Sequence, residues 1–160
     1  MQTIALNPRT RDITFVGGSP GLISGKQKLE QDLRAIIVEK LNSDPYTNGY
    51  GSNIYEMIPD MNGMDFHAAE ATIVMEVMDT ITRFQMIQLR SLDGIRRAPW
   101  TTDQSFAVEL AENRSQFIER VDSIKVQWNE TDLRWANVVV TVVTQDNDTV
   151  VIDNITLSLR

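Results

Sequence analysis

Residues 135–159 read WANVVVTVVTQDNDTVVIDNITLSL, and this stretch decides the fold. Apolar and polar side chains alternate along it with the twofold period of strands that bury one face. The short polar run Gln145–Asp148 divides it, so the pattern predicts strands at Trp135–Thr144 and Thr149–Leu159 that pair as a hairpin. The same period appears upstream at Ile124, Val126 and Trp128, before the polar turn 129–132. A three-stranded antiparallel meander therefore ends the chain.

Helical spacing dominates the residues before this meander. Leu29, Leu33, Ile36, Ile37 and Leu41 predict a helix at about 25–42, with Ser24 and Gln27 as a capping box. A second helix is predicted at about 65–92 and is ended by Gly94 and Pro99. A third follows at about 103–118, capped by Thr102 or Asp103.

The remaining segments have the composition of loops. Residues 42–63 are rich in Asn, Asp, Pro, Gly and Tyr, which predicts a shaped loop with one short helical turn at Ile54–Ile58. At the N-terminus, Ile13, Phe15 and Val16 predict a short strand, and the glycines of residues 17–21 predict a flexible turn. The expected fold is α+β, with an N-terminal arm at 1–24 and one domain at 25–160. About three helices of that domain pack on the C-terminal sheet.

Composition excludes several classes of function. The 160 residues suit one domain. No apolar run approaches the ~18 residues of a membrane span, and residues 1–8 do not resemble a signal peptide. The chain has no cysteine, which excludes disulfides and thiolate sites. Its net charge of −7 opposes binding to nucleic acid. We therefore expect a cytosolic origin, with no membrane or nucleic-acid partner.

The sequence offers little catalytic chemistry. His67 is the only histidine, so sites built from several imidazoles are excluded, and no phosphate-binding glycine loop occurs. We therefore expect no cofactor, no metal site and no catalytic residues. A cell-wall (peptidoglycan) hydrolase that acts through Glu56 or Glu70 is kept as an alternative.

The methionines are divided by their predicted surroundings. Those at helical spacing, Met75, Met78 and Met86, are expected to fill the core. Met57, Met61 and Met64 fall in the predicted loop, so they are candidates for an interface.

The last strand has an unusual composition for an edge. Soluble proteins protect edge strands with lysine, proline or bulges, but residues 149–159 contain neither lysine nor proline. One interpretation is that this strand accepts a partner strand by β-augmentation, through Val151, Ile155, Leu157 and Leu159. The other is that it lies inside its own sheet, for example beside the strand at Ile13–Val16.

The order of these elements resembles the baseplate-wedge and tail-sheath-initiator family of contractile-tailed phages, which carries a historical lysozyme label. The residues that resemble it are the helix KLEQDLRAII at 28–37, the loop motifs DPY at 44–46 and GYGSNI at 49–54, and the junction FIERVDSIKV at 117–126. At the junction, Arg120 matches the arginine of the family's Glu-Pro-Arg motif, but Glu119 stands where the proline would be.

The resemblance covers about residues 25–160 and implies a structural virion protein in the tail baseplate. It implies contacts with the tail sheath protein and other baseplate wedge proteins, with the tail tube as an additional candidate. Pro45, Tyr46 and Tyr50 of the loop would belong to the interface, and Arg120 would hold the junction or a neighbour through charge-assisted hydrogen bonds. Assembly would take place in the host cytoplasm. A transient assembly adaptor is the second alternative.

Overall fold

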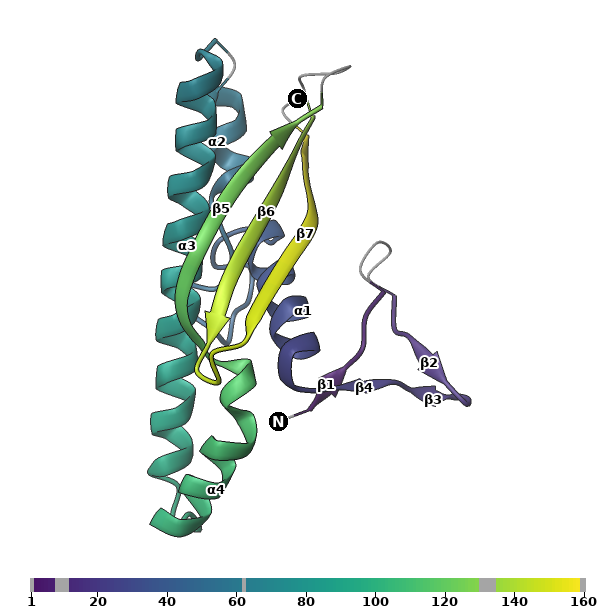
Figure 1. The fold of residues 1–160 in the computed structure, drawn as a ribbon, viewed down its shortest axis with the longest axis vertical. Coiled ribbons are helices and arrows are strands. Elements are labelled where there is room, and N and C mark those ends of the chain that lie inside the picture. Colours follow the sequence, from purple (N-terminus) through teal and green to yellow (C-terminus); the bar gives the residue numbers. More distant parts are fainter. Residues whose placement is uncertain (1, 8–11, 62, 130–134, 159–160) are drawn as a thin grey trace.

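The structure is a computed structural model that describes residues 2–7, 12–61, 63–129 and 135–158. Figure 1 shows a tall two-layer body with a small β arm that projects from one side. The elements in chain order are β1 (Thr3–Ile4), β2 (Phe15–Val16), β3 (Ser19–Pro20), β4 (Leu22–Ile23), α1 (Gly25–Val38), α2 (Ile54–Met61), α3 (Phe66–Arg96), α4 (Asp103–Asn113), the 3-10 turn η1 (Arg114–Gln116), β5 (Ile118–Trp128), β6 (Trp135–Thr144) and β7 (Thr149–Ser158).

The body is the predicted antiparallel meander packed on helices. The strand order is β5-β6-β7, so β6 is central and β5 and β7 form the two edges. Alternate side chains of β6 point inward and are buried, namely Ala136, Val138, Val140 and Val142. The helix α1 packs against β7, and α3 packs against β5. The α+β class with a C-terminal antiparallel sheet on helices is therefore confirmed.

Helix α1 differs from its prediction at both ends. Its N-cap is Ser24, but the Ser24 side chain makes no capping hydrogen bond, so the predicted capping box is wrong. The helix ends at Val38 and not near residue 42, because Lys40 leaves the helix to form a parallel bridge with Ser52. Tertiary pairing with the following loop therefore overrides the local helical pattern.

Helix α3 is longer than predicted. Asp65 caps its start by accepting a hydrogen bond of 2.9 Å from the N–H of Ala68. The helix then continues through Gly94 to Arg96 and ends before Pro99. A single glycine costs only about 1 kcal/mol in a helix, so it does not stop a helix that is otherwise favourable. The predicted short turn after residue 53 is likewise a complete helix, α2.

The third predicted helix is shorter than expected. Thr102 is its N-cap and accepts a hydrogen bond of 3.1 Å from the N–H of Ser105. The helix ends at Asn113, the turn η1 follows, and β5 begins at Ile118. The prediction that an α-helix extends to residue 118 is therefore wrong, because residues 114–116 form a 3-10 helix and β5 follows. Phe117 and Ile118 are buried in the body, so their apolar side chains fit the pattern of a helix as well as that of a strand.

The N-terminal arm is a three-pronged β element. One prong pairs β1 with β4, one contains the bridge Leu6–Ile13, and one pairs β2 with β3. Three backbone hydrogen bonds close the centre: Ala5 N–H to Gly21 O (2.8 Å), Gly21 N–H to Thr14 O (2.7 Å) and Thr14 N–H to Ala5 O (2.9 Å). A Cβ on Gly21 would lie 3.2 Å from Thr14 O, so the centre has little room for a side chain.

The predicted flexible turn of the arm is an ordered hairpin. Gly17 and Gly18 both have positive φ, at 60° and 84°, which suits the tight turn between β2 and β3. Gln31 of α1 attaches the arm to the body. Its side chain accepts from the N–H of Leu6 at 2.8 Å and donates to Ile4 O at 3.0 Å.

Candidate functional site

The strand β7 lies at an edge of the sheet. Within the described residues it pairs with β6 and with no other strand, so the interpretation as a central strand beside Ile13–Val16 is wrong. The segment at Ile13–Val16 belongs to the arm instead. The outer side of β7 therefore has backbone groups that β6 does not use.

The edge of β7 is protected at one point. The pairing with β6 shifts between Val138 and Val140, which leaves Asp153 and Asn154 opposite Val139 as a bulge. Arg34 of α1 covers this bulge, with its guanidinium 3.0 Å from Asp153 O and 3.6 Å from the Asp153 carboxylate. The edge is therefore divided into two stretches, 149–152 and 155–158.

The predicted interface side chains of β7 fall into different surroundings. Val151 is 52% exposed, as an interface residue would be. Ile155 and Leu157 are fully buried in the core, so the expectation that their side chains meet a partner is wrong. Alternation places them inward, where they hold β7 onto α1. Leu159 lies outside the described residues.

The opposite edge of the sheet is covered at its start. Gln85 of α3 approaches Ile118 O and Glu119 O at 3.5 Å each. Gln88 donates to Gln116 O at 2.7 Å and accepts from Ile118 N–H at 3.3 Å. Two irregularities between residues 118 and 123 also bend this strand. Because the start of β5 is both covered and irregular, β7 offers the more accessible edge.

Arg120 is exposed on β5 and lies within its irregular stretch. Among the residues that the structure describes, no ion pair of Arg120 is found. The expectation that it holds the helix-to-strand junction through charge-assisted hydrogen bonds therefore gains no support from contacts within the chain, and a contact with a neighbour stays a prediction.

The loop between α1 and α2 contains the other predicted interface residues. Pro45 is exposed and Tyr46 is 95% exposed, whereas Tyr50 is half-buried against the core. The N–H of Tyr46 donates to the Asp44 carboxylate at 2.9 Å, and this bond, with others from Thr47, lowers the Asp44 pKa from its ordinary value. The lowered pKa favours the folded loop above the ordinary Asp pKa, and the effect is lost as the pH falls through the lowered value.

Gly51 lets the base of this loop lie close to the end of α1. Its φ is +100°, and a Cβ built there would lie 2.2 Å from Lys40 O. The neighbouring Ser52 donates its side-chain hydroxyl to Ile37 O at 2.6 Å. The close approach of two backbone segments therefore requires glycine at position 51.

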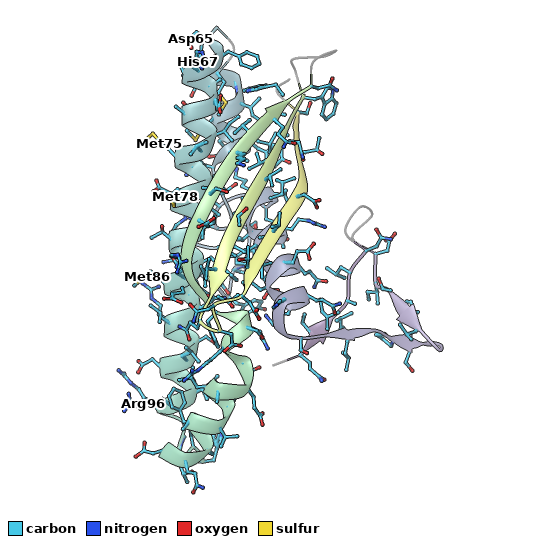
Figure 2. The ribbon with its side chains drawn as sticks, viewed as in Figure 1. Asp65, His67, Met75, Met78, Met86 and Arg96 are labelled. Carbon is cyan, nitrogen blue, oxygen red and sulfur yellow. The ribbon has the colours of Figure 1, made fainter. Side chains whose placement is uncertain are left out.

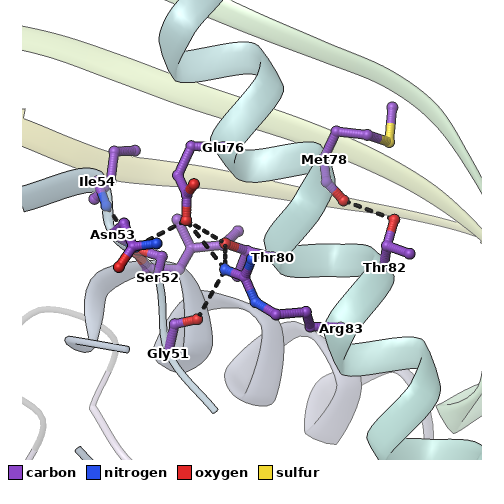
Figure 3. A network of polar contacts seen from close by, with 10 residues as sticks. Gly51, Ser52, Asn53, Ile54, Glu76, Met78, Thr80, Thr82 and Arg83 are labelled. Atoms are coloured by element: carbon purple, nitrogen blue, oxygen red, sulfur yellow. Dashed lines mark hydrogen bonds and ion pairs between the residues drawn. The ribbon is translucent and has the colours of Figure 1, made fainter. Parts of the chain in front are cut away.

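A buried carboxylate joins this loop to α3, as Figure 3 shows. Glu76 is 7% exposed and accepts hydrogen bonds from the N–H of Asn53 at 2.8 Å and from Arg83 at 3.0 Å. Arg83 also donates to Gly51 O at 3.3 Å and to Thr80 Oγ1 at 2.9 Å. The paired charges thereby fix residues 51–53 against the middle of α3. The sequence pattern did not indicate Glu76, because a helical carboxylate is usually solvated.

The two carboxylates of the hydrolase alternative have different surroundings. The Glu56 side chain is 55% exposed and forms an ion pair with Lys40 at 2.7 Å. Glu70 is half-buried, and His67 is exposed in the first turn of α3. In the described part of the chain, no group of three or more His, Cys, Asp or Glu side chains could hold a metal ion. None of the described helices is long and apolar enough to cross a membrane.

Five of these six methionines reverse their predicted surroundings, and Met64 does not. Met61 is buried and Met57 packs against the core, both from α2, so these two are wrong as interface candidates. Met64 is 44% exposed. Met75, Met78 and Met86 were expected in the core but lie on the solvent side of α3. The prediction failed because, among the described residues, α3 is covered mainly by β5, α1, α2 and α4, which leave its remaining face bare.

Comparisons with known proteins found no similar protein. No family model matches the chain, and no curated protein or solved structure is significantly similar to it.

Replacing Gly51 with alanine should destabilise the protein by about 1–3 kcal/mol, because alanine is strained at positive φ and its Cβ would overlap Lys40 O. Gly94→Ala is the matched control: it lies in α3 with free space around it and should stabilise the helix by up to about 1 kcal/mol. Urea unfolding measures both. Equal effects of the two variants would contradict the proposed role of Gly51.

Replacing Glu76 with alanine should cost about 2–3 kcal/mol, since Arg83 and the N–H of Asn53 would lose their acceptor. The control is Glu56→Ala, which removes a carboxylate from the exposed pair with Lys40 and should leave the urea midpoint unchanged. If the two variants unfold at the same urea concentration, Glu76 does not hold the loop.

Proposed function

We propose that this protein is a structural subunit of a contractile-tail baseplate that anchors or initiates the tail sheath, and that β7 receives a strand of the sheath protein. The open edge of β7 is the observation that carries the proposal. Sheet edges bind extended segments because unused backbone N–H and C=O groups can form a new ladder. The resemblance at residues 28–37, 44–54 and 117–126 supplies the biological setting.

In this proposal the backbone of β7 makes the contact and its side chains have separate roles. Ile155 and Leu157 keep the strand fixed to the core, so that its edge is already ordered before a partner arrives. Val151 lies on the exposed face, where it can pair with a side chain of the added strand. The bulge at Asp153 and the cover provided by Arg34 limit the added strand to one of the two stretches.

The loop of Pro45 and Tyr46 is the proposed contact for other baseplate wedge proteins, with the tail tube as an additional candidate. A tyrosine that is 95% exposed on a loop held by Gly51 and Glu76 offers a large contact area at a low entropic cost. Several copies would surround the tail tube in the virion, after assembly in the host cytoplasm. Arg120 is proposed as a charged contact to a neighbouring subunit.

The test of strand addition is hydrogen–deuterium exchange of the protein with and without purified tail sheath protein. A strand added to β7 should protect amides in residues 149–158 and leave the exchange of β5 unchanged. Unchanged exchange in β7 on a complex that still forms would contradict strand addition. Capture only during assembly, without retention in mature particles, would favour the transient adaptor.

A pair of variants separates edge pairing from docking on the sheet face. Val151→Lys places a charge on the edge strand, where lysine disfavours strand addition, so sheath binding should weaken. Thr141→Lys is the matched control, because Thr141 lies directly opposite Val151 on the central strand. Equal loss in both variants would indicate docking on the face and would contradict edge pairing.

A further inference from the structure

One side of the N-terminal arm is apolar. The three prongs each carry one cross-strand pair of apolar residues, and these pairs are Ile4–Leu22, Leu6–Ile13 and Phe15–Pro20. Directly paired residues share a side of a ladder, and residues two apart along a strand share it too. When this rule is applied step by step from Ile4 around the arm to Leu22, it places all six side chains on the same side. We call this surface the arm face.

The arm face is exposed to solvent. Its five large side chains, Ile4, Leu6, Ile13, Phe15 and Leu22, are 37–62% exposed. Isolated two-stranded ladders are at best marginally stable in water, and soluble proteins seldom leave apolar patches beyond a few hundred Å² uncovered. The arm approaches the body at Ile4, whose carbonyl accepts from Gln31, and at Leu6, which borders a cavity of about 220 Å³ beside α1. The arm face is therefore expected to dock on a partner.

A second uncovered apolar surface runs along α3. Met75, Met78, Met86 and Leu89 are 40–68% exposed and follow each other at helical spacing, with Ala71 and Thr82 on the same side. The exposed Asp79, four residues after Met75, lies at the border of this row, which we call the α3 stripe. Figure 2 shows Met75, Met78 and Met86 on the side of α3 that faces away from the sheet.

The two surfaces match in chemistry. The α3 stripe extends about 21 Å between Met75 and Leu89 at 1.5 Å per residue. A five-residue segment of the arm, such as residues 3–7, extends about 13 Å at 3.3 Å per residue. Both surfaces consist of apolar side chains, with Asp79 at the border of the α3 stripe, and flexible methionines adapt to the shape of a partner. A helix against an apolar β face is also the arrangement that this protein uses in its own core.

The positions of the two surfaces exclude contact within one molecule. In Figure 1 the arm projects from one side of the body, and α3 forms the opposite side. The arm of one molecule can reach the α3 stripe only on another molecule. An arm-to-arm dimer would leave the α3 stripe bare, whereas an arm-to-stripe contact covers both surfaces.

We propose that this protein associates with further copies of itself head to tail, with the arm face of one copy packed on the α3 stripe of the next. Such a contact joins different surfaces of the two partners, so it repeats until it closes a ring or continues as a filament. Neither of the two surfaces includes β7. The inference stands independently of the proposed function of β7.

The experiment is sedimentation of the full chain over a wide range of concentrations. We expect the average mass to rise with concentration. Phe15→Glu on the arm and Met78→Glu on α3 should each weaken the association about tenfold or more, because each buries an unpaired carboxylate in the contact. These two side chains are exposed, as are Val16 and Val108, which are changed in the controls. Circular dichroism should therefore show an unchanged fold in every variant.

Matched controls use exposed apolar residues outside the two surfaces. Val16→Glu changes the same prong on its other side, and Val108→Glu changes α4; both positions are 52–69% exposed. Neither control should alter the association. If Val16→Glu weakens it as much as Phe15→Glu does, the arm face is not the contact and the proposal fails.

Mixing the two defective variants identifies the head-to-tail arrangement. Phe15→Glu retains an intact α3 stripe and Met78→Glu retains an intact arm face, so one contact can form between them and a heterodimer should appear. A mixture that stays monomeric would overturn the arrangement. If the unmodified chain is monomeric at every concentration, a second copy does not bind the arm face. The proposal is then wrong, and the arm face binds a different protein.

Discussion

Burial of one side of the three-stranded sheet is the constraint on which the rest of the structure depends. The inward residues of β6 and β7 form a continuous apolar layer, and α1 and α3 cover it from either end of the strand order. The short helix α2 adds Ile54 and Met61 to this core. In the part of the chain that the structure describes, these helices leave the outer face of the sheet, the edge of β7 and the far side of α3 without cover. The surfaces available for binding are therefore a direct result of how few elements build the core.

The two edges of the sheet differ because their neighbouring helices differ. Along β5, α3 presents glutamines whose amides bond to backbone groups at the start of the strand. Along β7, α1 presents Arg34 at a single bulge. Glutamine both donates and accepts, so it substitutes for part of a missing strand, whereas arginine only donates. An added strand thus meets more competition at β5 than at β7.

The sequence predicted the body well and its uncovered surfaces poorly. Twofold alternation located β6 and β7, because a strand with one buried face has a period of two residues, whereas an amphipathic helix has a period of about 3.6. Helix ends were missed where a distant contact decided them, as with Lys40 and Ser52. Alternation shows that Ile155 and Leu157 lie on the same side of β7. It does not show whether that side faces the core or a partner, because this depends on how the helices pack on the strand. The same limit placed Met75 and Met78 in the core: periodicity shows that a face is apolar and not that another element covers it. The contact between Glu76 and Asn53 joins residues that are far apart in sequence, so no local pattern predicts it.

The closed centre of the arm has a consequence for variation. Because Ala5, Thr14 and Gly21 hold one another through their backbones, the centre depends little on the chain beyond it. The β2–β3 hairpin can then gain or lose residues at its turn without disturbing the closed centre. The arm therefore provides a site where related chains can differ in length, and where a peptide tag or a foreign loop can be inserted while the body folds as before.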